Sequence, residues 1–270
     1  IDVPARAIHL GFGLFLAFLT FPLLKKNRNK KNNLFNFVLA TIAFLVTFYL
    51  FHYYSEIVDR NGILLKHSIS FFGKEYSLPT ELIIGAIGIL LLLEATRRAI
   101  GTPLVIVASI FLIYSIFGQS MPEVISHQGL SLKRLIGYHW FGGEAIFGIP
   151  ISVSVSFVFL FVLFGSMLDY AGGGKYFLSL ALALVGKFRG GPAKASIMAS
   201  GLTGMISGSS IANVVTTGTF TIPIMKKTGF PAVKAGAIEV AASVNGQIMP
   251  PIMGAAAFII AEMLGITYFQ

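Results

Sequence analysis

The chain has 270 residues, of which 55% are hydrophobic and only 11% are charged, and its mean hydropathy is +0.81. Soluble domains carry about 25% charged residues, so this composition excludes a water-soluble globule and indicates a helical membrane protein. The net charge of +9 would suggest nucleic-acid binding in a soluble protein. Because basic residues also collect in the cytoplasmic loops of membrane proteins, we favour that explanation of the charge. The sequence has no cysteine, which excludes disulfides and cysteine metal sites.

Five apolar runs have roughly the length that a membrane-spanning helix needs. They are residues 5–24, 34–54, 80–95, 102–118 and 149–170. A shorter run, 176–185, predicts an interfacial or connecting helix. Aromatic residues of the segments 55–79 and 119–148, Trp140 among them, predict a belt at the membrane edge, with a docking surface for an external partner as the alternative.

The distribution of charges predicts the sidedness of the loops. Five basic residues lie in the short loop after the first run, which should therefore be cytoplasmic. Threading the chain from that loop places fourteen of the 20 lysines and arginines inside and eight of the eleven acidic residues outside. A single multi-pass topology thus assigns every loop to one side of the membrane.

Residues 194–225 predict a re-entrant helical hairpin. Lysines flank this segment, and no charged residue lies between Ala195 and Met225. The first arm has about 13 helical residues, which cover about 20 Å and are too few to cross a bilayer. A tip at 207–210 would therefore lie inside the membrane, where free backbone groups are tolerated only if protein buries them or water reaches them.

Residues 231–264 predict a helix that is broken in its middle. Pro250 and Pro251 remove two backbone donors and leave carbonyls of the first half without partners. Such carbonyls and a serine-rich tip are good ligands for a small hard cation, while the N-termini of the half-helices favour an anion. Discontinuous helices that meet near the midplane are typical of secondary transporters.

Within this region we separate residues that serve packing from residues that bind. Most of the small residues are interpreted as helix-packing positions. For Ser209, Ser210 and Asn213 we favour ligation of an ion or substrate, because Asn213 lies one helical turn after Ser209 and needs polar partners inside a membrane.

Other residues and other functions have plainer interpretations. Glu239 is interpreted as a snorkelling or cavity-facing structural acid, with a functional role as the alternative. Glu94, three and four residues before Arg97 and Arg98, is interpreted as part of an interfacial anchor. A serine protease is disfavoured because no histidine follows the hairpin, and no Walker loop indicates ATP hydrolysis. A purely structural subunit would leave the two breaks unexplained.

Several runs of the sequence resemble the fused 4TM/12TM membrane subunit of the tripartite ATP-independent periplasmic (TRAP) transporters. These are GGPAK at 190–194, SGSSIANVVTTG at 207–218, IPIMK at 222–226, QIMPPIMGAAAF at 247–258, LEATRR at 93–98 and GIP at 148–150. The resemblance covers nearly the whole chain. It implies an all-α polytopic membrane protein that contains half of an elevator-type inverted repeat.

The resemblance implies a domain organisation. Residues 1–118 would be a four-helix scaffold like the small subunit, and 119–148 an external connecting segment. Residues 149–270 would be the first half of the large transport subunit, so that the chain is the N-terminal part of a longer permease. The second hairpin and a second sodium site would belong to the other half.

The resemblance also implies a function, which is Na⁺-coupled import of small organic acids (carboxylates) across the bacterial or archaeal cytoplasmic membrane. A periplasmic solute-binding protein, usually of the TAXI class for the fused type, would deliver the substrate. Na⁺ is the expected bound ion, and no organic cofactor is expected. The alternative is a Na⁺- or H⁺-coupled anion transporter of similar hairpin design that works without a binding protein.

Finally, the resemblance implies positions for the sodium ligands and for the substrate. Ser209 and Asn213 of the hairpin would bind Na⁺ together with backbone carbonyls of Gly246, Met249 and Pro251 from the break. At the hairpin tip, Ser207 and Ser210 are expected to contact the substrate.

Overall fold

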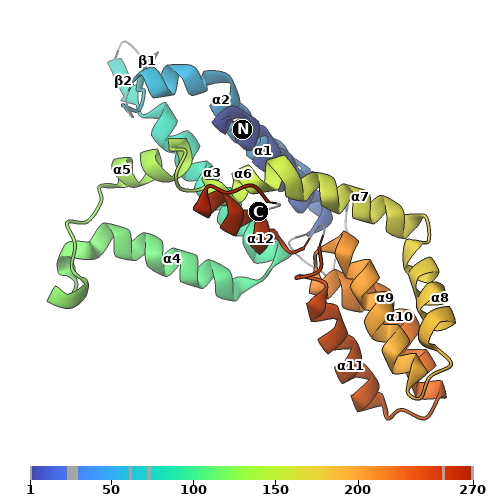
Figure 1. Cartoon of the computed structure of the whole chain (residues 1–270). Coiled ribbons are helices and arrows are strands. Elements are labelled where there is room, and N and C mark those ends of the chain that lie inside the picture. The colour runs from blue at the N-terminus through green and yellow to red at the C-terminus, as the bar shows by residue number, and fades with distance from the viewer. Residues whose placement is uncertain (1, 23–29, 61–62, 72–73, 251–252, 269–270) are drawn as a thin grey trace. The chain divides into compact units, whose positions relative to one another are not determined.

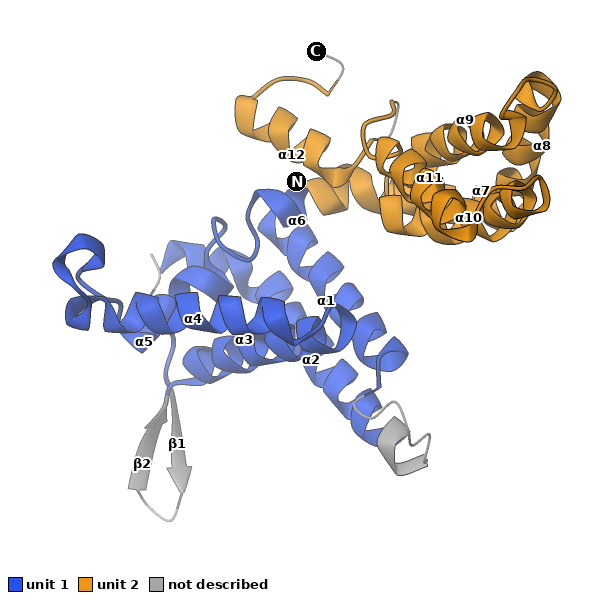
Figure 2. Cartoon of the chain, turned by 90° about the horizontal axis from the view of Figure 1, so that it is seen from below, with its two compact units in different colours: residues 1–152 blue, residues 153–270 orange. Residues whose placement is uncertain are grey.

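The computed structural model describes residues 2–22, 30–60, 63–71, 74–250 and 253–268 (Figure 1). For residues 30–33 and for the two strands only the backbone is described. The chain forms two compact units, Ile1–Ser152 and Val153–Gln270, which Figure 2 shows in blue and orange. Each unit is described below by itself.

Unit 1 is built from long apolar helices and one short β-hairpin. Its helices are α1 (Val3–Thr20), α2 (Lys30–Asp59), α3 (Thr80–Ala99), α4 (Thr102–Phe117) and α5 (Leu132–Ile136), with short η segments at Gly118–Ser120, Glu123–Ile125 and Gly137–Phe141. Strands β1 (His67–Phe71) and β2 (Lys74–Leu78) pair antiparallel, with His67 opposite Leu78. The sequence does not predict these two strands, which lie within the segment 55–79 between two apolar runs.

Helix length and hydropathy confirm a polytopic membrane protein. Four helical stretches are long and apolar enough to cross a membrane, namely Val3–Thr20, Leu34–Asp59, Thr102–Ser120 and Ile149–Tyr170. The remaining predicted span, the run at 80–95, is also helical and lies within the 20-residue helix α3. Both of its ends carry charged side chains, which lower its hydropathy. The sidedness of the loops remains a prediction, since part of the basic loop lies outside the described residues.

The segment after α4 belongs to the core of unit 1. Trp140 is completely buried and packs edge-to-face against Phe147, with 5.6 Å between ring centroids. A Cβ atom on Gly88 of α3 would lie 2.3 Å from the Trp140 ring, so only glycine lets the helix approach so closely. The prediction that Trp140 belongs to a membrane-edge belt is therefore wrong. The indole ring packs against α3, and its buried Nε1 atom has no hydrogen-bond partner among the described residues.

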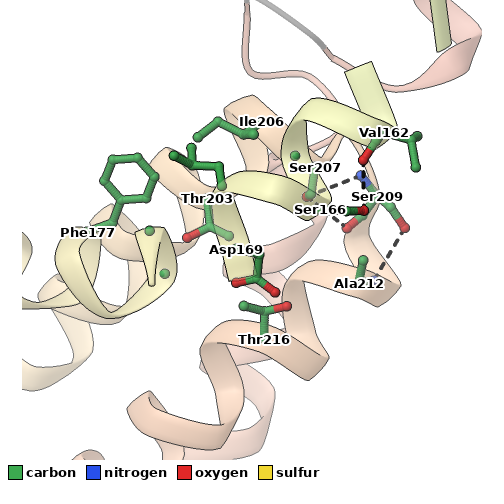
Figure 3. Close-up of a pocket in the computed structure, with 14 residues that line it drawn as sticks. Val162, Ser166, Asp169, Phe177, Thr203, Ile206, Ser207, Ser209, Ala212 and Thr216 are labelled. Atoms are coloured by element: carbon green, nitrogen blue, oxygen red, sulfur yellow. Dashed lines mark hydrogen bonds between the residues drawn. The ribbon is translucent and has the colours of Figure 1, made fainter. Parts of the chain in front are cut away.

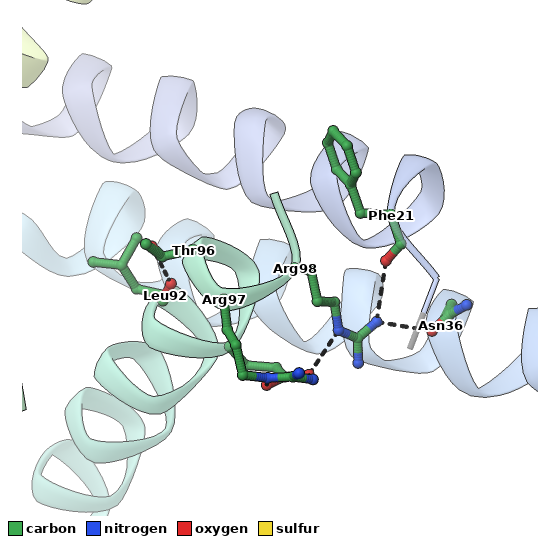
Figure 4. A network of polar contacts seen from close by, with 7 residues as sticks. Phe21, Asn36, Leu92, Thr96, Arg97 and Arg98 are labelled. Atoms are coloured by element: carbon green, nitrogen blue, oxygen red, sulfur yellow. Dashed lines mark hydrogen bonds and ion pairs between the residues drawn. The ribbon is translucent and has the colours of Figure 1, made fainter. Parts of the chain in front are cut away.

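A polar network joins the three long helices of unit 1 at one end (Figure 4). Glu94 accepts hydrogen bonds from Arg97 at 2.8 Å and from Arg98 at 2.7 Å. Arg98 also donates to Asn36 of α2 at 2.9 Å and lies over the Phe18 ring of α1. The predicted ion pairs form, and Arg98 in addition connects α3 to both neighbours.

Unit 2 contains the predicted hairpin and the broken helix. Helix α6 (Ile149–Val153) ends at the first residue of this unit, which then contains η4 (Ser154–Val158), α7 (Phe159–Tyr170), α8 (Gly173–Val185), α9 (Gly191–Ser207), α10 (Ser210–Lys227), α11 (Ala232–Asn245) and α12 (Ala255–Leu264). Helix α8 contains the short run 176–185, for which the sequence predicts an interfacial or connecting helix. Its Leu178 and Ala181 are buried in one cluster with Ala195 and Ala199 of α9.

Helices α9 and α10 form a tight antiparallel hairpin, and α11 packs against both of them (Figure 1). The arms have 17 and 18 residues and are therefore about 26 Å long, more than the 20 Å expected from the sequence. Only Gly208 and Ser209 separate the two helices. Gly208 has a φ of +58°, a left-handed conformation that glycine adopts without steric cost.

Candidate functional site

The hairpin tip meets the helix break at the two glycines Gly204 and Gly246. A Cβ atom added to Gly204 would lie 2.3 Å from the Gly246 Cα atom and 3.2 Å from Asn213 Nδ2. Only glycine therefore fits at position 204 between these two backbones. Three segments far apart in sequence, α9, α10 and the end of α11, are thus brought together around Asn213.

Asn213 is completely buried in this junction. Its Nδ2 atom donates to the carbonyl oxygen of Ser200 at 2.8 Å and to Ser200 Oγ at 3.0 Å. Its Oδ1 atom is buried and has no hydrogen-bond partner among the described residues. Leaving a buried amide oxygen unpaired costs about 1–3 kcal/mol, so this atom is available to a donor or a cation.

The break brings unwound backbone against Asn213, because a Cβ atom on Gly246 would lie 3.0 Å from Asn213 Nδ2. Helix α11 ends at Asn245 and α12 begins at Ala255. In the part of the chain that the structure describes, the Gly246 carbonyl accepts no backbone hydrogen bond. The Met249 carbonyl accepts one from Met253 N at 3.2 Å, and Met253 has a φ of +56°, an unfavourable conformation for a residue with a side chain. Pro251, the third predicted backbone ligand, lies outside the described residues.

The serines of the tip have local roles. Ser209 is the N-cap of α10, and its Oγ accepts a hydrogen bond from Ala212 N at 3.3 Å. The carbonyl of Ser209 accepts from Asn213 N in the first turn of the same helix. Ser210 Oγ accepts from Gln247 Nε2 at 2.9 Å, which links the tip directly to the break.

A cavity of about 390 Å³ lies beside the tip (Figure 3). Ser207, Ser209 and Thr203 line it from the hairpin, whereas Ser210 is not part of its wall. Asp169 of α7 and Thr216 of α10 lie next to each other in the same wall, and Asp169 is the one charged residue among the lining residues. An acidic wall favours a cation or a neutral group, so this cavity by itself is not an anion site.

A second polar cluster, not predicted from the sequence, surrounds Glu239 of α11. This residue is completely buried, which excludes the snorkelling orientation expected from the sequence. Its carboxylate accepts hydrogen bonds from four hydroxyl groups, those of Ser196, Thr217, Thr221 and Ser243. The sequence did carry a signal, because Thr217 and Thr221, like Glu239 and Ser243, are four residues apart and share one helix face.

Comparison with known proteins identifies the family. Residues 87–270 match the family described as "Tripartite ATP-independent periplasmic transporter, DctM component". A Salmonella typhimurium protein, YgiK, is 29% identical over 177 residues, which are 66% of this chain and 36% of that protein. The C4-dicarboxylate TRAP transporter large permease protein DctM of Rhodobacter capsulatus is 34% identical over 91 residues, which are 34% of this chain and 21% of that protein.

A third relative is the 2,3-diketo-L-gulonate TRAP transporter large permease protein YiaN of Escherichia coli, 26% identical over 100 residues, which are 37% of this chain and 24% of that protein. No solved structure matches the chain. The chain thus spans at most 36% of the length of these relatives. The family match covers more than half of the chain, including the hairpin, the break and the buried Asn213. The chain therefore belongs to the DctM family of TRAP transporters and is a multi-pass membrane permease component rather than an enzyme.

Proposed function

We propose that the chain is the N-terminal part of the permease of a Na⁺-coupled TRAP transporter that imports small organic acids by an elevator mechanism. A periplasmic solute-binding protein of the TAXI type would deliver the carboxylate to the cytoplasmic membrane. Two of the relatives are named for organic acids, C4-dicarboxylates and 2,3-diketo-L-gulonate, which supports this substrate class.

The observation that carries the proposal is the buried Asn213 Oδ1 atom, which has no hydrogen-bond partner among the described residues and belongs to a side chain packed against Gly246 of the break. Na⁺ prefers neutral and anionic oxygen ligands, and backbone carbonyls of unwound helices serve it in secondary transporters. Ser209 and the backbone carbonyls of Met249 and Pro251 would complete the proposed site. No cluster of three or more histidine or acidic side chains that could hold a metal ion occurs in the described residues.

Two further features support the mechanism and the fused organisation. A moving domain needs its own core, and residues 153–270 form a compact unit of their own. The DctM match begins at residue 87, within α3, so that α1, α2 and the β-hairpin precede it. We keep residues 1–118 as the proposed small-subunit scaffold, of which residues 87–118 also lie within the DctM match. Substrate would bind at the hairpin tip, with Ser207 and Ser210, once the second half of the repeat supplies the opposite wall.

Transport by the full-length protein in proteoliposomes tests this proposal. Uptake of radiolabelled carboxylates, C4-dicarboxylates included, is measured with an inward Na⁺ gradient or an equal K⁺ gradient, each with and without the solute-binding protein. We expect uptake only when Na⁺ and the binding protein are both present. Uptake that is equal without the binding protein would instead establish the autonomous transporter, and uptake that is equal in K⁺ would contradict the sodium site.

A further inference from the structure

The hydroxyl cluster around Glu239 has the geometry of a binding site. Both carboxylate oxygens are occupied, one by the hydroxyls of Thr217 and Ser243 and the other by those of Ser196 and Thr221. The Ser196 bond measures 2.6 Å and the Ser243 bond 3.3 Å. The carboxyl group and the hydroxyl residues Ser196, Thr217, Thr221 and Ser243 are buried.

Among the residues that the structure describes, no positive side chain forms an ion pair with this acid. The helices packed against α11 are α9 and α10, and the cations of the three helices are all exposed. They are Lys194, Lys226, Lys227 and Lys234. By contrast, Glu81 of unit 1, the other acid that is completely buried among the described side chains, forms an ion pair with Arg60 at 2.8 Å. An isolated carboxylate inside a protein is costly, and the usual remedies are a cation or a proton.

The geometry of the cluster favours a proton over a metal ion. Four hydroxyl oxygens already lie within hydrogen-bond distance of the carboxyl oxygens, so a metal would have to displace them. A proton needs no added volume. It forms an O–H bond on one carboxyl oxygen, and this group then donates a hydrogen bond to a neighbouring hydroxyl oxygen.

The hydroxyl groups can satisfy both protonation states. Thr217 Oγ1 can donate either to Glu239 or to the Asn213 carbonyl at 2.8 Å. Thr221 Oγ1 can likewise donate either to Glu239 or to the Thr217 carbonyl at 3.0 Å. When Glu239 carries the proton, a threonine can therefore accept from it and turn its own hydrogen to the backbone. No buried donor or acceptor is lost in either state.

A chain of hydroxyls leads from this cluster to the hairpin junction. Ser243 Oγ lies 3.3 Å from Glu239 Oε1 and 3.2 Å from Ser200 Oγ, and either serine can be the donor. Ser200 in turn accepts both hydrogen bonds of the Asn213 amide. The direction of the Ser243 hydroxyl thus depends on whether Glu239 needs a donor.

We propose that Glu239 is a proton-binding site of the hairpin domain and that its proton competes with cation binding at Asn213. Binding of a proton removes the negative charge that favours a nearby cation and releases the Ser243 hydroxyl toward Ser200. Binding of a cation at the junction has the opposite effect. The competition, though not the proton site itself, rests on the sodium site proposed above.

Infrared difference spectroscopy of the purified full-length permease tests the proton site without reference to sodium. We expect a C=O stretching band of a protonated carboxyl that grows as the pH falls and shifts in D₂O. The band should be absent from Glu239→Gln and unchanged in Glu262→Gln, the matched change of an exposed acid on α12. A wild-type protein without a titrating band, or a band that Glu239→Gln retains, would overturn the assignment.

Variants that keep the acid give a second measurement if Glu239→Gln does not fold. Thr217→Val and Thr221→Val remove hydrogen bonds from the carboxyl and should shift the band, whereas Thr219→Val, on the exposed side of α10, should not. Equal spectra for all three variants would show that the band does not arise from this cluster.

The competition is measured as the apparent Na⁺ dissociation constant over a series of pH values. Where the proton is bound, one competing proton raises that constant about tenfold for each unit by which the pH falls. Glu239→Gln should abolish this dependence. A wild-type constant that does not change while the infrared band titrates would refute the competition alone. A wild-type protein that binds no Na⁺ would refute the proposed sodium site, and the infrared result would still decide the proton site.

Discussion

Replacing Gly204 by alanine is expected to disrupt the junction between the hairpin and the helix break. The new Cβ atom would lie 2.3 Å from the Gly246 Cα atom, whereas nonbonded carbon atoms approach to about 3.5–4.0 Å. The two backbones must therefore separate by more than about 1 Å. Overpacking of this kind costs about 1–3 kcal/mol, which exceeds the roughly 0.5–1 kcal/mol that alanine contributes in a helix.

The structural change should affect the sodium site as well as stability. Because Asn213 Nδ2 lies 3.2 Å from the same Cβ position, the Asn213 amide and Gly246 cannot keep their present packing. We expect a lower thermal unfolding midpoint in detergent and an apparent Na⁺ affinity that is weaker by at least tenfold, equivalent to about 1.4 kcal/mol. Both quantities can be measured on one preparation of the full-length protein.

The matched control is Gly236→Ala on α11, where nothing lies within 4 Å of the added Cβ atom. This variant should be as stable as the wild type or slightly more stable, with the same Na⁺ affinity. If Gly204→Ala behaves like Gly236→Ala in both assays, the close approach of α9 to the break is not present in the protein.

Two further changes test other parts of the structure. Arg98→Lys should lower the thermal midpoint, because lysine cannot reach Glu94, Asn36 and the Phe18 ring together. Arg97→Lys, its control, should lower the midpoint less, and neither variant should alter the Na⁺ dependence of transport. Thr203→Val should raise stability by about 1 kcal/mol, since the hydroxyl of Thr203 is buried without a partner among the described residues; a lower midpoint would reveal an unseen hydrogen bond.

The sequence predicts those parts of the fold that depend on periodicity and on helix breakers. Long apolar runs became helices, and the paired prolines lie in the gap between α11 and α12. The β-hairpin at 67–78 and the burial of Trp140 were not predicted, because both depend on tertiary contacts. Trp140 requires the small residue Gly88 on a distant helix, and no local pattern reveals that pairing.

The candidate site was predictable to a similar extent. The spacing of Ser209 and Asn213 predicts a shared helix face, and the structure places Asn213 against Gly246 of the break. The spacing in the sequence does not reveal that Ser209 caps its own helix or that Ser210 pairs with Gln247. The sequence does not predict the burial of Glu239, because most of the hydroxyls that surround this acid come from two other helices.

The measurement that tests the central claim most directly is binding of radiolabelled Na⁺ to the purified full-length protein and to Asn213→Ala. Asn245→Ala is the matched control, because this asparagine is exposed at the end of α11 beside the break. We predict saturable binding to the wild type and to Asn245→Ala, and binding that is weaker by at least tenfold in Asn213→Ala. Equal binding to all three proteins would contradict a sodium site between the hairpin and the broken helix.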